Sequence, residues 1–316
     1  MKVLVGFSDK EYPNVVKFDE IGDCNFFRYD REYLIKNIEN YEIFVPHLFE
    51  DIDAEVISKA KKLKILATPS TGSDHIDTNA LREKGIHFIS LNDDRSFINE
   101  ITSTAEMNWL LILACIRNLR NLLNRVQVNK SWINTDIRGF EINNKTLGII
   151  GYGRLGKMVA RYGKCFGMRV LAYDIDDRQY DDFVEAVELN DLYAQSDVIS
   201  LNAKLNPTSA YIINANAVSL MKDGVVVVNT ARGGMVESNA IINGLDSGKI
   251  SAVGFDVFNN EYEAAQLPLD PLIERSFSDN RIIVTPHAGG STYDAHGKVF
   301  GKVADLIALY LSNKKS

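Results

Sequence analysis

The sequence has few of the residues that build disulfides and metal sites. Its 316 residues include three cysteines and five histidines. Cys24, Cys115 and Cys165 form no CxxC pair, and no histidines stand at metal-site spacing. We therefore expect no bound metal, and we predict that the three thiols are free and buried in a protein of the reducing cytosol.

Long apolar runs and an excess of positive charge are also missing. The longest uncharged apolar run, Trp109 to Ile116, is far too short to span a bilayer, and the apolar N-terminal run is too short for a signal peptide. The formal net charge of −7 provides no basic surface for nucleic acid or for an anionic membrane. With 46% hydrophobic and 24% charged residues, the chain is typical of a globular, cytoplasmic protein.

What the sequence does contain is a regular alternation of short apolar runs with helical stretches. The first series has strand candidates at 2–6, 41–45, 64–67 and 87–90, with helices at 54–62 and 77–84. The second has strand candidates at 146–150, 169–173, 198–201, 225–229, 250–255 and 282–284. Residues 100–129 predict one long helix, and the C-terminal residues predict an amphipathic one. This order predicts an α/β protein with two doubly wound parallel-sheet domains, Rossmann-like or flavodoxin-like, and an interdomain cleft.

The most specific motif is Gly151-Tyr152-Gly153-Arg154-Leu155-Gly156. An apolar run precedes it, a helical stretch follows, and a second apolar run ends at Asp174. This is the context of a dinucleotide-binding turn. The first glycine permits the tight turn, the second lets the backbone approach a pyrophosphate, and the third lets the helix pack closely on the strand. The helix N-terminus attracts the phosphates. Asp174 would bind the adenosine ribose and repel a 2′-phosphate, so the motif predicts NAD (NADH) as cofactor, with NADP less favoured.

Three further residues follow predicted strands of the second series, where open α/β sheets bind ligands. Arg232 lies at a glycine-rich turn, and its planar guanidinium suits bidentate binding of a carboxylate; a surface arginine is the alternative. Asp256 ends an apolar strand and needs a hydrogen-bond partner there, for which a nicotinamide carboxamide and a helix N-terminus are equal candidates. His287 ends the last apolar run and suits proton exchange near neutral pH, a structural histidine being the alternative.

Together these residues meet the needs of one reaction. Oxidation of a secondary alcohol beside a carboxylate needs a carboxylate anchor, a base for the hydroxyl proton and a hydride acceptor. Arg232, His287 and NAD would supply them. In the reverse direction His287 would protonate the forming alkoxide while Arg232 polarises the ketone.

The order and spacing of these motifs resemble the D-isomer-specific 2-hydroxyacid dehydrogenases over essentially the full length of the chain. The resemblance rests on the glycine motif and on residues 70–77, 104–106, 229–234, 256–261 and 285–290. It implies that Arg232, Glu261 and His287 are catalytic, with Glu261 tuning His287. It also implies a homodimer built partly on the long helix and on the arm around Trp132.

The nucleotide-binding series begins in the middle of the chain, and a helix returns at the far end, which predicts a discontinuous partner domain. Residues 1–98 and 287–316 would form this substrate domain, and residues 99–286 the NAD-binding domain. The resemblance assigns binding residues in both. His47 and the loop Ser70, Thr71, Gly72 and Ser73 would bind the substrate, the loop through backbone N–H groups. Cofactor contacts would come from Gly151, Gly153, Arg154, Leu155, Gly156, Asp174, Asn202, Ala203, Lys204, Thr230, Ala231, Asp256 and Gly289.

Two departures from the family pattern bear on substrate and cofactor. Pro46-His47 stand where the phosphoglycerate enzymes carry an Arg-Ser pair. A phosphate on the substrate therefore lacks a charge-assisted hydrogen bond, which would contribute about 1.5–3 kcal/mol to binding. Lys204 falls where the family binds the adenine end of the cofactor, and its positive charge weakens the preference for NAD over NADP. We therefore predict an NAD(H)-dependent oxidoreductase that interconverts a short D-2-hydroxy acid and its 2-keto acid, such as glyoxylate or hydroxypyruvate. An NAD(H)-sensing, co-repressor-like protein and a D-3-phosphoglycerate or phosphite dehydrogenase remain the alternatives.

Overall fold

The chain divides into two compact units in a computed structural model, which describes residues 1–7, 15–47, 50–176, 179–259, 261, 267 and 269–314. Unit 1 comprises Met1–Ile101 and Ser291–Ser316, together with Glu261. Unit 2 comprises Thr102–Asn260 and Leu267–Gly290. The chain returns to unit 1 at Ser291, so His287 belongs to unit 2, whereas the sequence suggested a boundary at residue 287.

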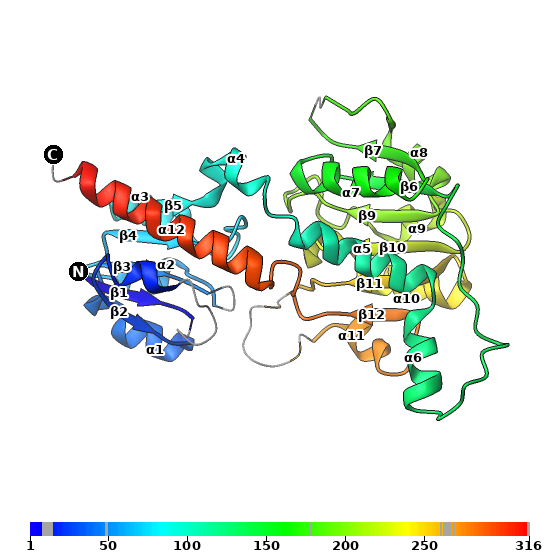
Figure 1. The fold of residues 1–316 in the computed structure, drawn as a ribbon, viewed down its shortest axis with the longest axis horizontal. Helices are drawn as coiled ribbons and strands as arrows, with labels where there is room; N and C mark the ends of the chain where they lie inside the picture. Colours follow the sequence, from blue (N-terminus) through cyan, green and yellow to red (C-terminus); the bar gives the residue numbers. More distant parts are fainter. Residues whose placement is uncertain are drawn as a thin grey trace. The chain divides into compact units, whose positions relative to one another are not determined.

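Unit 1 is built on a five-stranded parallel sheet with the strand order β2-β1-β3-β4-β5 (Figure 1). The strands are β1 (Lys2–Val5), β2 (Asp23–Phe26), β3 (Ile43–Val45), β4 (Ile65–Thr68) and β5 (His87–Ser90). Every residue of β3 and β4 is buried, which explains their continuous apolar runs. This strand order is that of flavodoxin-like folds, whose direction of winding changes between β1 and β3.

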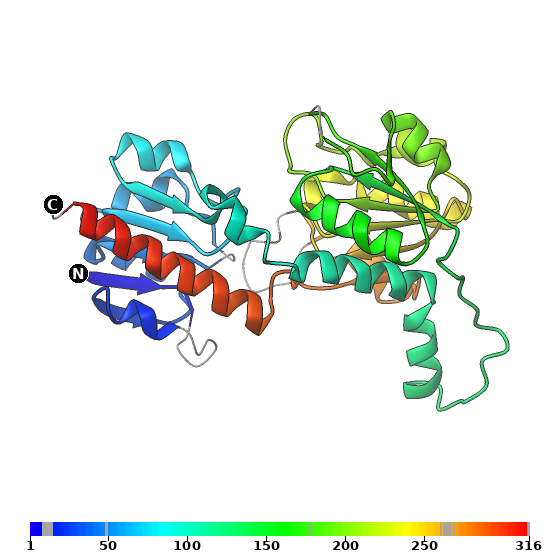
Figure 2. The same cartoon turned by 45° about the horizontal axis from the view of Figure 1, so that its top comes forward.

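Helices cover both faces of this sheet. They are α1 (Arg31–Asn37), α2 (Ala54–Lys59), α3 (Thr78–Glu83), α4 (Arg95–Ile98) and α12 (Tyr293–Asn313), with the 3₁₀ turns η1 (Val15–Phe18), η2 (Ile38–Asn40) and η3 (Leu91–Asp93). The C-terminal helix α12 packs on β4 and β5, and Figure 2 shows it lying along the sheet. Its Phe300, Val303 and Ile307 complete an apolar cluster with β-strand residues such as Val5 and Ile65. One core of unit 1 therefore joins the two ends of the chain.

Unit 2 is built on a seven-stranded parallel sheet with the order β12-β11-β10-β9-β6-β7-β8. The strands are β6 (Thr146–Ile150), β7 (Arg169–Tyr173), β8 (Val184–Ala186), β9 (Val198–Leu201), β10 (Val225–Asn229), β11 (Ile250–Phe255) and β12 (Ile282–Val284). The chain runs outward from β6 through β8, then returns to β9 and continues to β12 on the other side. The direction of winding thus changes between β6 and β9, which is where such sheets bind ligands.

Two layers of helices enclose the unit 2 sheet. On one face α5 packs against α7, β10 and β11, and the other face carries side chains from α8 to α11. The elements are α5 (Ser103–Ile116), α6 (Leu119–Gln127), α7 (Arg154–Cys165), α8 (Leu189–Gln195), α9 (Ala215–Leu220), η4 (Gly233–Met235), α10 (Ser238–Ser247) and α11 (Pro271–Ser276). The predicted α/β class with two doubly wound parallel sheets is confirmed.

Two sequence predictions, one on a helix and one on the cysteines, were wrong. The expected single helix over 100–129 is two helices, because Asn118 adopts a left-handed conformation with φ of 54°, which asparagine tolerates better than most residues. The three thiols are free as expected, but only Cys115 is buried; Cys24 is half-buried and Cys165 is exposed.

The described residues include neither a membrane-spanning helix nor a cluster of metal-binding side chains. In that part of the chain no helix has the length and apolar character needed to cross a bilayer. Nor do three or more His, Cys, Asp or Glu side chains gather there in a way that could hold a metal ion.

Candidate active site

The candidate residues of unit 2 follow the carboxyl ends of its parallel strands. Gly151 follows β6, Asp174 follows β7 and Asn202 follows β9. The next three strands, β10, β11 and β12, lead into Thr230–Arg232, Asp256 and Thr285–His287. Because all seven strands are parallel, these residues lie along one edge of the sheet, the ligand-binding edge of this architecture.

The glycine motif forms the tight turn that the sequence predicts. Gly151 has φ of +93°, and a Cβ there would lie 2.5 Å from the backbone nitrogen of Ala203. A Cβ at Gly156 would lie 2.1 Å from the carbonyl oxygen of Gly151, so this glycine lets α7 approach the turn. Gly153 differs, since a Cβ there would meet no atom within 4 Å. The protein itself does not require glycine at 153, whereas a ligand that approaches the backbone would.

The start of α7 fits a pyrophosphate. Gly153 is the N-cap residue and provides no side-chain hydrogen bond to the first turn. The first N–H groups of a helix lack partners within the helix and attract anions. Arg154 and Leu155, the next residues, are half-buried, and burial lowers the pKa of Arg154.

Asp174 is held by the same turn. Its Oδ2 accepts a hydrogen bond of 2.7 Å from the backbone N–H of Tyr152, and its Oδ1 accepts one of 3.1 Å from Asp176 N–H. The fully buried Tyr152 donates its hydroxyl to Asp181 at 2.9 Å and stacks on Tyr180. Sequence analysis gave Tyr152 no role, although it joins the glycine turn to the segment after β7. These contacts fix a carboxylate beside the turn, which fits the ribose of a dinucleotide.

A buried chain of polar side chains links the ends of β9 and β10 to α5. Asn202 donates to Ser200 Oγ at 2.9 Å, Ser200 donates to Asn108 Oδ1 at 3.0 Å, and Asn108 donates to Thr230 Oγ1 at 3.0 Å. Asn108 and Ser200 are fully buried. Sequence analysis missed both, and a polar residue on the buried face of an apolar helix was the signal for Asn108. Ala203 and Lys204 follow Asn202 in the chain; Ala203 is half-buried and Lys204 is exposed.

Asn229 shapes the turn that carries Arg232. Its Oδ1 accepts from Ala231 N–H at 3.0 Å, and its Nδ2 donates to the carbonyl oxygen of Arg232 at 2.9 Å. A Cβ at Gly233 would lie 2.0 Å from the backbone of Phe258. Glycine is therefore required because the segment after β11 crosses this turn. Arg232 itself is half-buried, and its Nη1 donates to Ala231 O at 2.7 Å.

Asp256 binds the turn that carries His287. Its carboxylate accepts hydrogen bonds from the Thr285 hydroxyl, from Ala288 N–H at 2.9 Å and from Gly289 N–H at 2.8 Å. Its backbone carbonyl accepts the N–H of His287 at 2.8 Å. No described helix begins at Asp256, so the helix N-terminus considered as its partner was wrong. The half-buried His287 has φ of +48°.

The predicted substrate loop lies in unit 1, after β4. Ser70 N–H donates to the hydroxyl of Thr68 at 3.2 Å, and Gly72 N–H donates to the hydroxyl of Ser70 at 3.0 Å. The carbonyl oxygen of Thr71 accepts the side-chain amide of Asn92. Ser73 is half-buried, as is the rest of the loop. The loop is therefore ordered by its own hydroxyl groups.

His47, after β3, is part of the core of unit 1. It is 3% exposed, stacks on Tyr29 with ring centroids 4.2 Å apart, and donates from Nε2 to the carbonyl oxygen of Tyr29 at 3.1 Å. Burial lowers the pKa of His47 from its usual 6.5, against an opposing effect of that hydrogen bond. The ring is neutral near pH 7, so it offers no positive charge to a ligand.

Glu261 is half-buried and belongs to unit 1, whereas Arg232 and His287 belong to unit 2. Residues 260 and 262–266 around it lie outside the described part of the chain. Its catalytic role stays a prediction.

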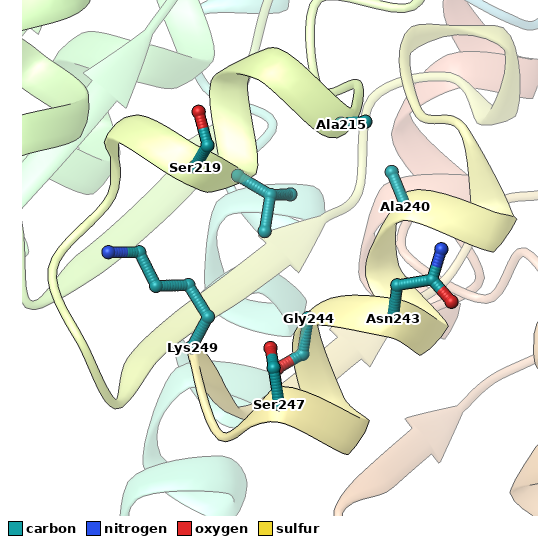
Figure 3. A pocket seen from close by; sticks show the side chains of 8 residues that line it. Ala215, Ser219, Ala240, Asn243, Gly244, Ser247 and Lys249 are labelled. Atoms are coloured by element: carbon teal, nitrogen blue, oxygen red, sulfur yellow. The ribbon is translucent and has the colours of Figure 1, made fainter.

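A hollow of about 340 Å³ lies elsewhere in unit 2 (Figure 3). Its walls come from α9 and α10 and from Lys249, just before β11. Lys249 pairs with Asp223 at 3.0 Å. None of the candidate site residues lines this hollow: its lining is Ala215, Val218, Ser219, Ala240, Asn243, Gly244, Ser247 and Lys249.

One edge of the unit 2 sheet carries the glycine turn, the fixed carboxylate of Asp174, and the ionisable side chains of Arg232 and His287. This combination defines a nucleotide-dependent oxidoreductase. Residues 109–289 match the family model for "D-isomer specific 2-hydroxyacid dehydrogenase, NAD binding domain". The chain belongs to this family, and its cofactor is NAD.

Relatives support the assignment along the whole chain. The hydroxypyruvate reductase of Thermotoga maritima is 34% identical over 95% of this chain and 94% of its own length. The D-3-phosphoglycerate dehydrogenase of Methanocaldococcus jannaschii is 33% identical over 97% of this chain, which spans 57% of that relative. The crystal structure of D-lactate dehydrogenase from Aquifex aeolicus, complexed with NAD and lactic acid, has a TM-score of 0.85 and 28% identity, covering 99% of this chain and 96% of that one. The protein is an oxidoreductase of the CH–OH class.

Proposed function

We propose that the protein reduces a short, unphosphorylated 2-keto acid to the D-2-hydroxy acid with NADH, and catalyses the reverse oxidation with NAD. The main support is the placement of Arg232, Asp256 and His287 after three neighbouring strands, at the same sheet edge as the dinucleotide turn. A carboxylate anchor and a proton donor beside a nicotinamide site fit this reaction.

The chain's own groups supply binding and proton transfer. Bound NADH supplies the hydride that reduces the keto carbon. Arg232 binds the substrate carboxylate and polarises the keto oxygen through its guanidinium N–H groups. His287 donates a proton to that oxygen as it gains negative charge, and takes the proton back in the oxidation. Glu261 orients His287, which is the role that the chain's resemblance to the family implies.

The loop after β4 gives further support for carboxylate binding. The N–H groups of Ser70 and Gly72 already donate within the loop, so we assign the contact to those of Thr71 and Ser73. His47 adds no positive charge to the substrate side, because its imidazole is buried, neutral and bonded to the Tyr29 carbonyl. A phosphate would gain no charge-assisted bond there, and we therefore favour glyoxylate, hydroxypyruvate or a small aliphatic homologue.

Preference for NAD over NADP is assigned to Asp174. Its carboxylate is fixed by Tyr152 and Asp176, so it cannot turn away from a 2′-phosphate without losing two hydrogen bonds. Lys204 is exposed and would offer a cofactor phosphate only a solvent-screened charge.

We also propose that unit 1 is the substrate domain, that unit 2 is the NAD-binding domain, and that the protein acts as a cytoplasmic homodimer. Unit 2 supports the dimer with exposed apolar side chains on α6 and the arm after it, including Leu123, Val128 and Trp132.

The test is NADH oxidation with a panel of 2-keto acids of graded size, with and without a phosphate. We expect turnover with small unphosphorylated acids and only with the D-isomer in the reverse direction. His287→Asn should lower kcat by about 10²-fold or more while NADH binding is retained. Arg232→Ala should chiefly raise the KM for the keto acid.

Four results would contradict the proposal. Full activity of His287→Asn would remove the histidine from proton transfer. NADH binding without turnover of any keto acid would instead favour an NAD(H)-sensing protein. Preference for a phosphorylated acid would favour a D-3-phosphoglycerate dehydrogenase, and turnover of phosphite would favour a phosphite dehydrogenase.

A further inference from the structure

His287 has a backbone conformation that L-residues adopt at an energetic cost. Its φ of +48° lies in the left-handed region, and histidine has a Cβ that crowds the backbone there. Such a conformation persists only where the surroundings hold it. The residues on either side of His287 show what holds it.

Hydrogen bonds from both sides of His287 converge on one carboxylate. Asp256 Oδ1 accepts from the Thr285 hydroxyl at 2.5 Å and from Ala288 N–H at 2.9 Å. Asp256 Oδ2 accepts from Gly289 N–H at 2.8 Å. The backbone carbonyl of Asp256 accepts the N–H of His287 itself at 2.8 Å. Asp256 therefore binds four of the five positions from 285 to 289, all except Pro286.

Burial makes these bonds strong and specific. Asp256 is 1% exposed, so its carboxylate depends on protein donors for the solvation it lacks. Hydrogen bonds to an ionised acceptor are roughly twice as strong as neutral ones. A Cβ at Gly289 would lie 3.0 Å from Asp256 Oδ2, so glycine permits this close approach.

We propose that Asp256 and Thr285 are positioning residues for the acid–base histidine, an inference that rests on the proposed role of His287. The Asp256 carboxylate fixes the 285–289 turn, and the turn fixes the direction in which the imidazole leaves the backbone. Asp256 thus affects the rate of proton transfer through His287. This role is distinct from the cofactor contact that the family resemblance implies for Asp256.

Thr285 offers the cleanest test, because its hydroxyl bonds to Asp256. Thr285→Val keeps the shape of the side chain and removes the donor, whereas Thr285→Ser keeps the donor and removes a methyl group. We expect Thr285→Val to lower kcat for keto-acid reduction by about 10- to 100-fold, the usual effect of displacing a reacting group by a fraction of an ångström to 1 Å. Thr285→Ser should retain kcat within about threefold of the wild type, and the NADH Kd should stay unchanged in both variants.

Asp256→Asn provides the second variant. The carboxylate of Asp256 accepts with both oxygens, whereas an asparagine amide has only one. Its NH₂ group would face the N–H of Ala288 or of Gly289, so one of these two hydrogen bonds would be lost. We expect a larger loss of kcat than in Thr285→Val, with a larger solvent deuterium isotope effect on kcat in both variants because proton transfer becomes slower. Loss of folding alone would not raise the isotope effect. Thermal unfolding of each variant gives the folded fraction.

The results separate this inference from the proposed function. If His287→Asn abolishes turnover while Thr285→Val and Asp256→Asn keep the wild-type kcat, the positioning role is wrong and the histidine's role stands. If Asp256→Asn raises only the NADH Kd and keeps kcat at saturating NADH, Asp256 acts on the cofactor and the inference is again wrong. If His287→Asn is fully active, the proposed function itself fails. Should Asp256→Asn not fold, the comparison of Thr285→Val with Thr285→Ser still decides.

Discussion

Several side chains at the strand ends of unit 2 bind the turns next to them. Asp174 accepts a hydrogen bond from the N–H of Tyr152. Asn229 forms hydrogen bonds with the backbone of Ala231 and Arg232, and Asp256 accepts from the turn that carries His287. Each is a short side chain at the end of a strand, and the N–H groups it accepts lie in turns after strand ends, where the sheet offers them no partner. These residues therefore determine where the neighbouring functional groups are held.

The glycines of the dinucleotide turn should separate binding from folding. A methyl group at Gly153 meets no protein atom, whereas one at Gly156 would lie 2.1 Å from Gly151 O. We expect Gly153→Ala to retain the wild-type free energy of unfolding within about 1 kcal/mol but to raise the NADH Kd, because the methyl group occupies the approach of the pyrophosphate. Gly156→Ala, the matched variant, should lose about 1–3 kcal/mol of stability.

Denaturant unfolding and NADH fluorescence titration measure the two quantities. Unchanged NADH affinity of folded Gly153→Ala would place the pyrophosphate away from this turn.

His47 should make stability dependent on pH. Burial lowers its pKa in the folded protein from the usual 6.5, so between these two values the unfolded chain binds a proton that the folded protein does not. The free energy of unfolding therefore falls as the pH decreases below about 6.5, until the folded pKa is reached. His47→Gln should flatten this dependence between about pH 7 and pH 5.

The control is His87→Gln, which removes an exposed imidazole that stacks on Tyr310. Denaturant unfolding at several pH values checks both variants. An unchanged slope for His47→Gln would show that other groups cause the acid destabilisation.

At the scale of elements, burial decided what the sequence could predict. The predicted bounds of six unit 2 strands are confirmed, because β6, β9 and β10 are buried along their whole length and appear as unbroken apolar runs. β2 was missed, since its residues Asp23–Phe26 are only partly buried and lack an apolar pattern. The break between α5 and α6 depends on the left-handed Asn118, which stands among good helix formers and gives no local signal.

Contacts distant in sequence could not be predicted. The residue types at the strand ends, such as Arg232 and His287, were visible because each follows an apolar run. The partners of Asp256 lie 29 to 33 residues later in the chain, and Asn108 binds Thr230 across 122 residues. A single sequence does not specify such pairs, because they depend on how the helices pack on the sheet.

The Asn108 network should stabilise the α5–sheet contact. Asn108→Leu removes both bonds of the amide, so Thr230 Oγ1 loses the donor Asn108 and the Ser200 hydroxyl loses its acceptor while keeping its bond from Asn202. We expect a loss of about 1–3 kcal/mol in the free energy of unfolding. Glu106→Gln, an exposed change on the same helix, should stay within about 0.5 kcal/mol of the wild type. Equal stability of Asn108→Leu and the wild type would mean that leucine packing replaces the network.

At the scale of the whole molecule, a group of exposed apolar side chains lies on α6 and on the arm after it, including Leu123, Val128, Trp132 and Ile133. α6 has no buried residue, and Trp132 is 89% exposed on the arm after it. Figure 1 shows α6 and this arm extending from the sheet of unit 2. Such a group of apolar side chains is typical of a protein–protein contact.

The proposed homodimer makes this surface testable. Light scattering should give twice the chain mass of 35.4 kDa for the wild type. Trp132→Asp combined with Leu123→Asp should give a monomer, because two buried charges would face an apolar interface. Phe277→Asp, at an exposed position after α11, is the control and should stay dimeric. A monomeric wild type would contradict the proposal.

The C-terminal helix α12 has a consequence for synthesis on the ribosome. The cluster around Val5 and Ile65 needs Phe300, Val303 and Ile307 from α12. The strands of this sheet are made first, and one apolar face of the sheet therefore stays uncovered until residues 300–307 have been translated. Unit 2 meets no such delay, since its residues are made in one almost continuous stretch. A chain truncated after residue 290 and released from the ribosome should thus hold a folded unit 2 and an incomplete unit 1, which would be a substrate for chaperones.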